Sequence, residues 1–506
     1  MKASQHLASF LLFVISVSTH GQDTLRIDSS FATKPWEANV GILATATSGN
    51  QLPFWMRSNQ FGSVPLEGLS TSLIANVQRS YQKYPNKKLV DWGMALDLRL
   101  NAGQNFEVIP VEAYVKARLG AFQIKAGRSK DISGLVDSTL STGSFALSGN
   151  ALGIPKIELS IPNFLDLPFL KKIIAIKGSF SYGWMGKVPI QYEKFNGSSV
   201  PTYFHNASFH VRFGKPAWRL KLYTGINHEV LWGSDKKIFE DQYNLTTAQA
   251  FFHVITGKKY VRDGLMRDIS KIGNHLGAVD TGLEYATNDL TLLVYRQFFY
   301  EKGALGYLAN AKDGLTGISL VNKNTSNNKW IWRRFLVEFF YSKNQAGERD
   351  SKKTPSGPEY YYNHGVYQEG YSYKGDGLGN PLITSRIYAR KNLPNDPINY
   401  FVNNRVVAYN VGTEGSILSW GYLVKLTYSQ NYGEYRTSDI PYWLTGGRHE
   451  RNPIYGLFQK VDQFSGIVEI NRHLKNNLFL GATLAIDNGK LLYNSVGGSL
   501  RLVKKW

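Results

Sequence analysis

A tyrosine-rich stretch between residues 343 and 404 carries the side chains of this chain that are best suited to binding chemistry. Sugar C–H faces pack on aromatic rings, sugar hydroxyls bind amides, and guanidinium groups bind carboxylates or phosphates through paired hydrogen bonds. The stretch and the residue after it supply all three types: Tyr360-Tyr361-Tyr362-Asn363-His364-Gly365, Tyr367, Gly370, Tyr371, Tyr373, Gly377-Leu378-Gly379-Asn380-Pro381, Arg386, Arg390 and Arg405. The pattern is typical of a carbohydrate-binding surface, and a self-packed tyrosine cluster is the structural alternative.

Residue spacing gives little support to catalysis. His205 and His210 have opposite parity, so on a regular strand they cannot share a ligand set. Asp91 and Asp97 share one face but lie roughly 20 Å apart at ~3.3 Å per residue, too far for a glycosidase acid/base pair. The chain has no cysteine, no phosphate-binding loop and no His-Glu-x-x-His pattern. We therefore expect no catalytic residues, no metal and no cofactor, and an outer-membrane hydrolase is a third hypothesis.

The first 21 residues indicate export. Lys2 precedes an apolar run from Leu7 to Val17, and the small residues Thr19 and Gly21 stand at the −3 and −1 positions of the expected cleavage site. This is typical of a secretory signal peptide, residues 1–21, cleaved after Gly21. Residues 22–506 are then predicted to form a single domain, and they contain no apolar stretch near the ~18 residues of a spanning helix.

The charge balance favours acidic partners outside the cell. Lys and Arg number 58 against 38 Asp and Glu, a net charge of +20. Because export argues against nucleic acid, lipid headgroups, lipopolysaccharide or an acidic capsular polysaccharide are the expected partners. Aromatic residues make up 13% of the chain, which suits membrane-interface girdles or sugar stacking.

Two neighbouring stretches, Val90–Leu100 and Val111–Leu119, alternate apolar and polar residues without interruption. A period of two means strands whose successive side chains point to opposite faces. Each is about the length of a tilted membrane-crossing strand, roughly 9–11 residues. A soluble sandwich can show the same pattern, so the hairpin alone leaves lipid and protein core open.

Alternating runs recur to the C-terminus, and we count 18. Besides the two above they are 38–47, 72–78, 122–127, 155–161, 174–184, 203–213, 218–226, 279–285, 290–299, 315–321, 335–341, 405–412, 418–430, 457–470, 478–486 and 496–506.

The lengths of the connections alternate. Short ones, several with turn residues, are predicted at Gly120, Lys215-Pro216, Asn288-Asp289, Glu414-Gly415 and Arg472–Asn477. The intervening ones are mostly long: 48–71, 128–153, 186–201, 228–275, 343–404 and 431–456. This rhythm predicts a transmembrane outer-membrane β-barrel of about 18 antiparallel strands, with both termini and the short turns in the periplasm. A soluble sandwich or propeller does not explain it.

Aromatic and charged positions fit the barrel. Trp92, Trp218, Trp420 and Trp506 fall near the short turns, and Trp184 and Tyr428 fall near the long loops, as two membrane interfaces require. The inward face carries both signs with a basic surplus: Arg99, Lys116, Arg118, Lys125, Arg212, Arg219, Lys221 and Lys425 against Asp91, Asp97, Glu112, Glu158 and Glu284. These charges either bridge opposite walls and plugs or meet a ligand. Helical spacing in Phe239–Ile255 and Gly264–Ile272 predicts short helices, inside an extracellular loop, that plug or cap the mouth.

The first loop contains Pro53-Phe54-Trp55-Met56-Arg57-Ser58-Asn59-Gln60-Phe61-Gly62, which resembles the signature of the Wzi capsule-assembly and attachment barrels in their Bacteroidetes-type form. Further matching pieces are Ala126-Gly127-Arg128, Ser148-Gly149-Asn150-Ala151, Ile154-Pro155-Lys156-Ile157, His228 to Trp232-Gly233, Tyr361-Tyr362-Asn363 to Gly379-Asn380-Pro381, and Asn403-Asn404-Arg405. The resemblance spans about residues 38 to 506. It implies an outer-membrane lectin that holds capsular polysaccharide at the cell surface and is not known as an enzyme.

We therefore expect a surface lectin that binds capsular or other anionic polysaccharide and attaches or helps assemble it. The candidate carbohydrate-binding residues are Arg57, Asn59, Gln60, Arg128, Trp232, Tyr371 and Arg405. The alternative is a porin-like channel for anionic or saccharide solutes. Expected partners are the polysaccharide, outer-membrane lipid with lipopolysaccharide, and the barrel-assembly machinery during biogenesis.

Overall fold

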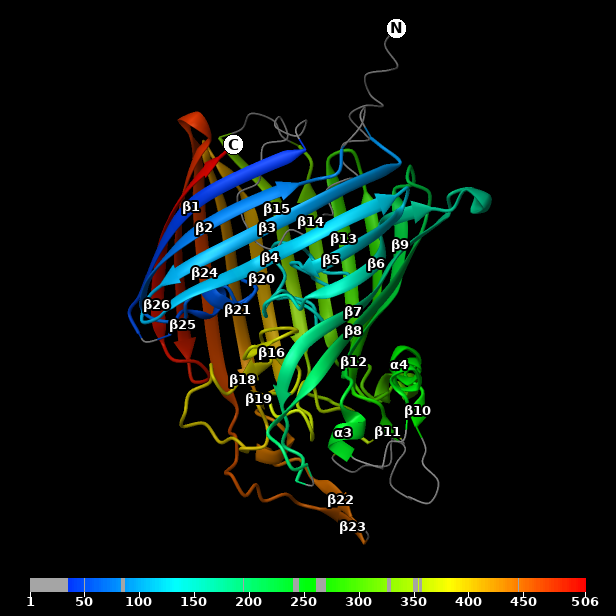
Figure 1. Cartoon of the computed structure of the whole chain (residues 1–506). Coiled ribbons are helices and arrows are strands. Elements are labelled where there is room, and N and C mark those ends of the chain that lie inside the picture. Colours follow the sequence, from blue (N-terminus) through cyan, green and yellow to red (C-terminus); the bar gives the residue numbers. More distant parts are fainter. Residues whose placement is uncertain are drawn as a thin grey trace.

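The chain forms one closed, 18-stranded antiparallel barrel in the computed structural model (Figure 1). The structure describes residues 35–49, 51–82, 87–193, 195–239, 245–260, 270–324, 329–348, 354, 357–444 and 446–506. The first strand pairs with the last from Asn39 opposite Lys505 to Thr47 opposite Gly497, which closes the sheet. The predicted signal peptide lies outside the described residues.

All 18 predicted runs lie on barrel strands. The strands are β1 (Trp36–Thr47), β2 (Leu69–Arg79), β3 (Val90–Ala102), β4 (Phe106–Leu119), β5 (Phe122–Arg128), β6 (Lys156–Asp166), β7 (Ile174–Pro189), β8 (Ser199–Phe213), β9 (Leu220–Trp232), β12 (Asn274–Ala286), β13 (Leu290–Tyr300), β14 (Gly314–Asn322), β15 (Trp330–Tyr341), β20 (Val406–Ile417), β21 (Trp420–Asn431), β24 (Val461–Leu474), β25 (Leu478–Gly489) and β26 (Ser495–Lys505). The predicted fold class is confirmed.

The connections need two refinements. Glu414 and Gly415 lie inside β20, so the predicted turn there is wrong; the turn is Leu418-Ser419, where Leu418 takes φ 55°. Connections 103–105 and 490–494 are short although they stand at the long-loop end. The last residue returns to the first strand, with the N–H of Trp506 donating to the Ala38 carbonyl at 2.9 Å.

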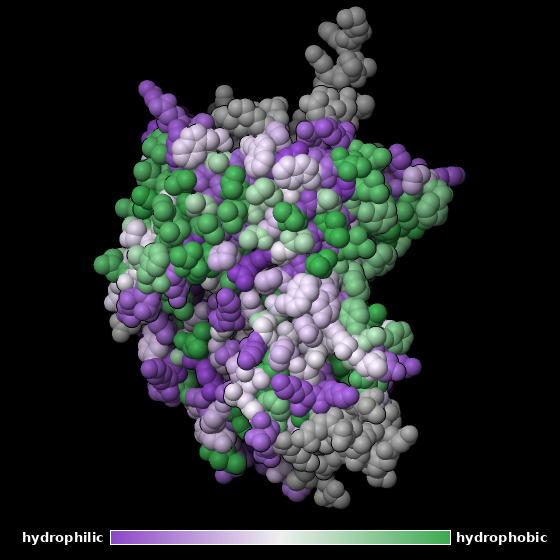
Figure 2. Space-filling model, in the orientation of Figure 1, coloured by the Kyte–Doolittle hydropathy of each residue, from purple (hydrophilic) through white to green (hydrophobic). Residues whose placement is uncertain are grey.

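The hairpin β3–β4 shows why the alternation produces a membrane wall. On β3 the side chains of Val90 and Trp92 are 64% and 48% exposed, whereas Asp91 and Asp97 are 5% and 1% exposed. The apolar faces point outward, where bilayer hydrocarbon covers them, and the charged faces point into the barrel. Figure 2 shows the apolar residues gathered on the part of the wall nearer the termini, with hydrophilic residues prevailing at the loop end.

The inward charges are paired with each other and with a segment that crosses the interior. Arg79 and Arg118 lie 3.1 and 3.7 Å from Asp91 on the wall. Lys130, which follows β5, lies 2.6 Å from Asp97. Nearby, Lys125 and Lys156 surround Asp131 and Glu158 at 2.8–3.5 Å. The described inward charges therefore largely neutralise one another, as the salt-bridging interpretation predicted.

Residues 129–155, the long inner segment, run across the barrel from β3 to β20. Asp137 accepts hydrogen bonds from Ser319 of β14 at 2.7 Å and lies 2.9 Å from Arg334 of β15. Glu338 of β15 accepts from the Ser141 hydroxyl at 2.6 Å and the Thr142 N–H at 2.7 Å. This segment thus joins distant parts of the lumen wall. It forms hydrogen bonds with side chains on seven strands: Asp97, Asp280, Gln297, Ser319, Glu338, Asn410 and Lys425.

The first loop, residues 51–68, forms a short inner segment beside it. It contains the four-residue helix α2 (Phe54–Arg57), which is buried throughout. The indole N–H of Trp55 donates to Thr427 at 3.2 Å, and the Lys425 ammonium lies 4.0 Å from the Trp55 ring centroid. This cation–π contact helps to compensate the buried charge of Lys425.

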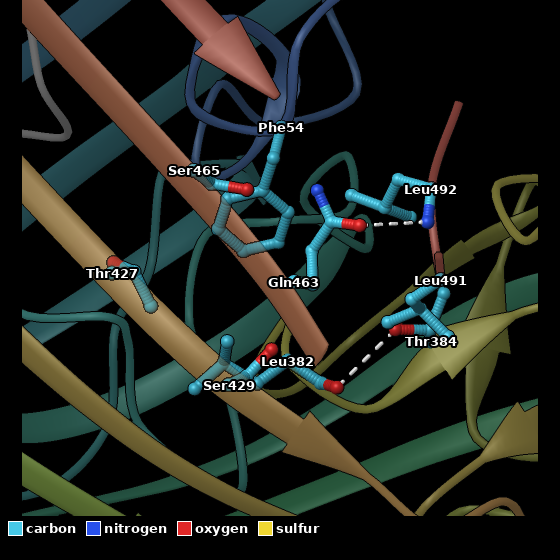
Figure 3. Close-up of a pocket in the computed structure, with 9 residues that line it drawn as sticks. All are labelled: Phe54, Leu382, Thr384, Thr427, Ser429, Gln463, Ser465, Leu491 and Leu492. Atoms are coloured by element: carbon cyan, nitrogen blue, oxygen red, sulfur yellow. Dashed lines mark hydrogen bonds between the residues drawn. The ribbon is translucent and has the colours of Figure 1, made fainter. Parts of the chain in front are cut away.

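The short inner segment packs closely against the wall and against the loop before β20. A cavity between Phe54, Leu382, Ser429 and Gln463 measures only about 10 Å³ (Figure 3), close to the space that one water molecule needs. In the same place the Gln463 side-chain oxygen accepts the Leu492 N–H at 3.0 Å. The prediction that extracellular loops plug the barrel is confirmed for these segments.

The predicted helical loop behaves differently. It forms α3 (Asp235–Phe239) and α4 (Thr247–Thr256), but α4 packs on the outside of the wall and not in the mouth (Figure 1). Residues 264–269 of the second predicted helix lie outside the described residues, and the next two form β11 (Ser270–Lys271), which pairs with β10 (Lys259–Tyr260). No helix in the described part of the chain is long and apolar enough to cross a membrane.

Because its polar contacts hold the long inner segment inside the barrel, breaking them should let ions pass through the lumen. Removing one partner of a buried charge pair costs about 3–5 kcal/mol. We therefore expect the double variant Asp137→Ala, Glu338→Ala to loosen residues 129–155 and to show frequent ion-conducting steps in a planar bilayer, whereas the unchanged protein is nearly silent.

The exposed Glu450→Ala variant is the control, since it removes a carboxylate outside the barrel. Heat-dependent gel mobility checks that each barrel has closed. Stable open steps from the unchanged protein would contradict a plugged lumen and favour the channel alternative.

Candidate functional site

The loop between β15 and β20 closes the mouth, and its described residues 357–405 are here called the cap segment. Its tyrosines are anchors. The Tyr361 hydroxyl donates to Asp313 at 2.7 Å, and the Tyr371 hydroxyl donates to the Ala146 carbonyl of the long inner segment at 2.8 Å. The Tyr362 hydroxyl binds the Phe145 carbonyl. All three rings are fully buried, so for them the self-packed alternative is what the structure shows.

A buried carboxylate fixes the base of the cap segment. Glu359 accepts four backbone N–H groups, those of residues 301 to 304, at 2.5–3.1 Å. In return Glu301 accepts the N–H of Tyr360 at 2.9 Å. Burial, aided by the nearby Glu359, raises the pKa of Glu301 to about 8, despite the opposing effect of Lys302. The base of the cap therefore contains a carboxyl group that stays protonated to a higher pH than an ordinary glutamate does.

The outer part of the cap segment holds an open, basic cavity of about 190 Å³. This is smaller than the roughly 300–1,000 Å³ of pockets that enclose drug-sized ligands, and it suits one unit of a longer polymer. Its lining combines cations, an amide and aliphatic groups: Arg386, Ala389, Arg390, Lys391, Leu393, Asn395 and Val402.

Backbone carbonyls orient the two guanidinium groups of this cavity. Arg386 donates to the carbonyls of Asp396 at 3.3 Å and Pro397 at 2.8 Å. Arg390 donates to the Leu492 carbonyl at 2.8 Å and to the Asn494 side chain at 2.9 Å, which ties the cap to the last loop.

The charge of the cavity is not neutralised by protein carboxylates. Within the described ranges, no acidic group lies within ion-pair distance of Arg386, Arg390 or Lys391, and the neighbouring Asp396 is already paired with Arg436 at 3.0 Å. The site therefore keeps a positive potential toward the outside, which attracts an anionic ligand.

Tyr493 borders the cavity and offers the aromatic surface that sugar stacking needs. Its ring is 39% exposed, and its hydroxyl accepts the N–H of Lys391 at 3.1 Å. The Arg390 guanidinium lies 5.5 Å from the ring centroid. Sequence reasoning missed Tyr493 because it lies in a short connection far from the tyrosine-rich stretch. A tyrosine in a turn at the long-loop end, Leu491-Leu492-Tyr493-Asn494, is the signal that could have identified it.

The four candidate residues of the first loop and β5 lie under the cap segment. Arg57 is 8% exposed and stacks on Tyr388 with 3.6 Å between guanidinium and ring centroid. Asn59 is 6% exposed and donates to the Thr142 carbonyl at 3.0 Å, and Gln60 is half-buried. Arg128 donates to the Pro110 carbonyl at 3.1 Å. These four residues lie beside the inner segments, beneath the cap segment, and none of them lines the basic cavity.

The other three candidates are separated. Trp232 is 1% exposed and stacks on Phe251 of α4, on the outside of the wall. Tyr371 is fully buried on the inner side of the cap segment, and Arg405, 7% exposed, donates to the Lys343 carbonyl at 2.9 Å. In this structure neither the indole nor the phenol ring has a face open for sugar stacking. Arg386 and Arg390 of the tyrosine-rich stretch, in contrast, do reach an open cavity.

Groups suited to catalysis or metal binding lie away from the cavity. His228 and His275 are 2.9 Å apart on the outer face of the wall, and His210 faces inward 3.0 Å from Asp280. Among the residues that the structure describes, no group of three or more His, Asp or Glu side chains is arranged to hold a metal ion. The chemistry that the cavity offers is ligand recognition by its cationic side chains, by the Asn395 amide and by the Tyr493 ring.

The model of the family described as capsule assembly protein Wzi matches residues 55–384 of the chain. Among solved structures, Wzi of Escherichia coli, described as an outer membrane protein involved in group 1 capsule assembly and a carbohydrate-binding β-barrel, matches with a TM-score of 0.52 and 14% identity over 94% of this chain and 85% of that one. OccK11 and OprD of Pseudomonas aeruginosa match with TM-scores of 0.43 and 0.44 at 9% and 7% identity, over 93% of this chain and 95% and 94% of theirs. No curated protein matches the chain.

Ionisation of Glu301 predicts that the cap loosens as the pH rises. Its pKa is raised above the ordinary value of 4.5 to about 8, so its contribution to stability is complete below that ordinary value and is lost as the pH rises through 8. We expect hydrogen exchange at the Tyr360 amide, corrected for intrinsic rates, to accelerate by about tenfold or more between pH 5 and 9.

Glu301→Gln keeps the shape and removes the charge, so exchange in this variant should stay slow at pH 9. The exposed Glu450→Gln variant should behave as the unchanged protein does. A pH response that survives in Glu301→Gln would mean that another group controls the cap.

Proposed function

The chain belongs to the capsule assembly protein Wzi family, and we propose that it binds an anionic surface polysaccharide and attaches it, or helps assemble it, at the cell surface. The fold is that of outer-membrane barrels, with the cap segment at the end away from the termini (Figure 1). The observation that carries the proposal is the open basic cavity with Tyr493 at its border.

The cavity matches the chemistry of an acidic sugar. A carboxylate or phosphate meets Lys391 and the free edges of two guanidinium groups whose other N–H atoms are already bound to carbonyls. The sugar ring then packs on Tyr493, and Asn395 binds hydroxyls. Since carbonyls hold Arg386 and Arg390 in place before a ligand arrives, little side-chain entropy is lost on binding.

The predicted residues of the first loop and the cap support the site in this proposal. Arg57 holds Tyr388, whose hydroxyl binds Asp376, and Arg405 joins the end of the cap to Lys343. In this proposal Asn59, Gln60, Arg128 and Tyr371 keep the inner segments and the cap in register, and Trp232 holds α4 against the outside of the wall. We further propose that a signal peptide ending at Gly21 directs export and that the barrel-assembly machinery inserts the chain. Outer-membrane lipid then surrounds the barrel.

Binding of the purified protein to isolated acidic cell-surface polysaccharide tests the cavity. We expect the double variant Lys391→Ala, Tyr493→Ala to bind about tenfold or more weakly, since a charged contact and a stacking surface are lost. Binding by the unchanged protein should also weaken as the salt concentration rises.

The matched control is Lys475→Ala, Tyr307→Ala, which removes a lysine from a periplasmic turn and an exposed tyrosine from another loop. Equal affinity of the two double variants would contradict the assignment of the cavity.

In cells, Arg57→Ala and Arg405→Ala are expected to release polysaccharide into the medium while the barrel still assembles. The reason is that each change loosens a contact of the cap without touching the wall. The cell-bound and released fractions are measured together with heat-dependent mobility. A normal cell-bound fraction in the double variant would show that neither arginine supports attachment.

A further inference from the structure

Helix α4 lies against the lipid-facing side of the barrel. Phe251 stacks on Trp232 with ring centroids 5.2 Å apart and meets the Tyr182 ring at 5.8 Å. Tyr182 shares its strand face with Phe180 and Trp184, which are 42% and 44% exposed, so this is the outward face of β7. Figure 1 shows α4 beside the barrel near the loop ends of the strands.

The height of α4 corresponds to the outer membrane interface. Trp184 pairs with Tyr203, and Tyr203 pairs with Trp232, so these aromatic residues form one cross-strand row near the loop ends of three adjacent strands. Trp and Tyr at the loop end of a barrel strand mark the boundary between hydrocarbon and headgroups. The helix therefore lies in the plane of the outer leaflet.

One flank of α4 is apolar and has no protein partner in the described structure. Ala250, Phe251 and Val254 face the wall, and Val254 is fully buried. At roughly 100° per residue, Phe252 and Ile255 lie on the neighbouring flank, where they are 53% and 36% exposed. This arrangement is that of an interfacial helix whose apolar flank enters the acyl region.

Lysines gather where the helix ends. Lys258 follows directly, and Lys259 of β10 stands opposite Lys271 of β11. Like charges directly opposite each other destabilise a strand pair. Within the described residues no carboxylate reaches ion-pair distance of these three lysines, and the nearby Glu359 already binds four N–H groups.

Burial has the largest effect on the ionisation of Lys271. Burial lowers the pKa of Lys271, Lys259 lowers it further, and Glu359 acts in the opposite direction. Gly257, which ends the helix at φ 60°, brings the Lys271 ammonium to 3.8 Å from where a Cβ on the glycine would stand. The lysines and the apolar flank therefore meet at one end of the same helix.

We propose that α4, Lys258 and the paired strands β10 and β11 form a docking site for an anionic glycolipid of the outer leaflet, a phosphorylated lipid of the lipid A type. Its acyl chains pack on Phe252 and Ile255, and a phosphate binds Lys258, Lys259 and Lys271. The site lies outside the wall, away from the basic cavity of the cap, so polysaccharide and glycolipid are held at separate places.

The test uses the full chain in phosphatidylcholine nanodiscs that contain bisphosphorylated or dephosphorylated lipid A, with lipid retention measured by native mass spectrometry. We expect the bisphosphorylated lipid to be retained preferentially. Lys259→Ala, Lys271→Ala should reduce its retention about tenfold or more. Lys215→Ala, Lys475→Ala, the same charge change on the periplasmic turns, should leave it unchanged.

Hydrogen exchange locates the contact independently of affinity. Bisphosphorylated lipid A should slow exchange in residues 247–260, and Phe252→Ser, Ile255→Ser should abolish this protection while the barrel remains closed by heat-dependent mobility. Equal retention of both lipids, equal retention by both lysine variants, or protection confined to other parts of the chain would overturn the proposal. Protection of α4 without added lipid A at rising protein concentration would assign the surface to a second copy of the chain instead.

Discussion

The closed ring of backbone hydrogen bonds is the constraint on which the rest of this structure depends. In hydrocarbon no water satisfies a free strand edge, so the sheet has to return to its first strand. Pairing of β1 with β26 achieves this and leaves no edge among the barrel strands. Eighteen strands, however, enclose an interior that side chains of the wall alone cannot fill, and the interior faces of the strands are polar.

That polar interior determines what the loops must carry. Asp97, Glu338 and Lys425 would each be costly to bury alone, and each is satisfied by an inner segment: by Lys130, by Ser141 and Thr142, and by Trp55. The loops are therefore part of the folded core rather than appendages of the barrel. The tyrosines of the cap segment then bury themselves on the inner segments, which leaves recognition to the outermost residues.

The two proposed binding places follow from the same separation. Inside the mouth, most described cations are paired with carboxylates, and Lys425 lies over the Trp55 ring, because an unpaired charge is costly in a buried place of low polarity. At the outer rim, Lys391 is exposed and Arg390 half-buried, and Lys258 and Lys259 beside α4 are exposed; among the described residues none of the four has a carboxylate at ion-pair distance. Only charges of this second kind remain available to an acidic polymer or a lipid phosphate.

The sequence by itself determined the barrel. Three patterns sufficed to predict it: alternation with a period of two in 18 runs, connections of alternating length, and outward tryptophans such as Trp92 and Trp184. They sufficed because strand geometry and the bilayer act on each residue locally. It also singled out the cap segment and, with Arg386 and Arg390, two residues of the basic cavity. Only the tertiary structure decided which aromatic residues are anchors and which are exposed. Tyr371 is buried and Tyr493 is open, since their surroundings come from segments more than 100 residues away in sequence, and no local pattern records such contacts.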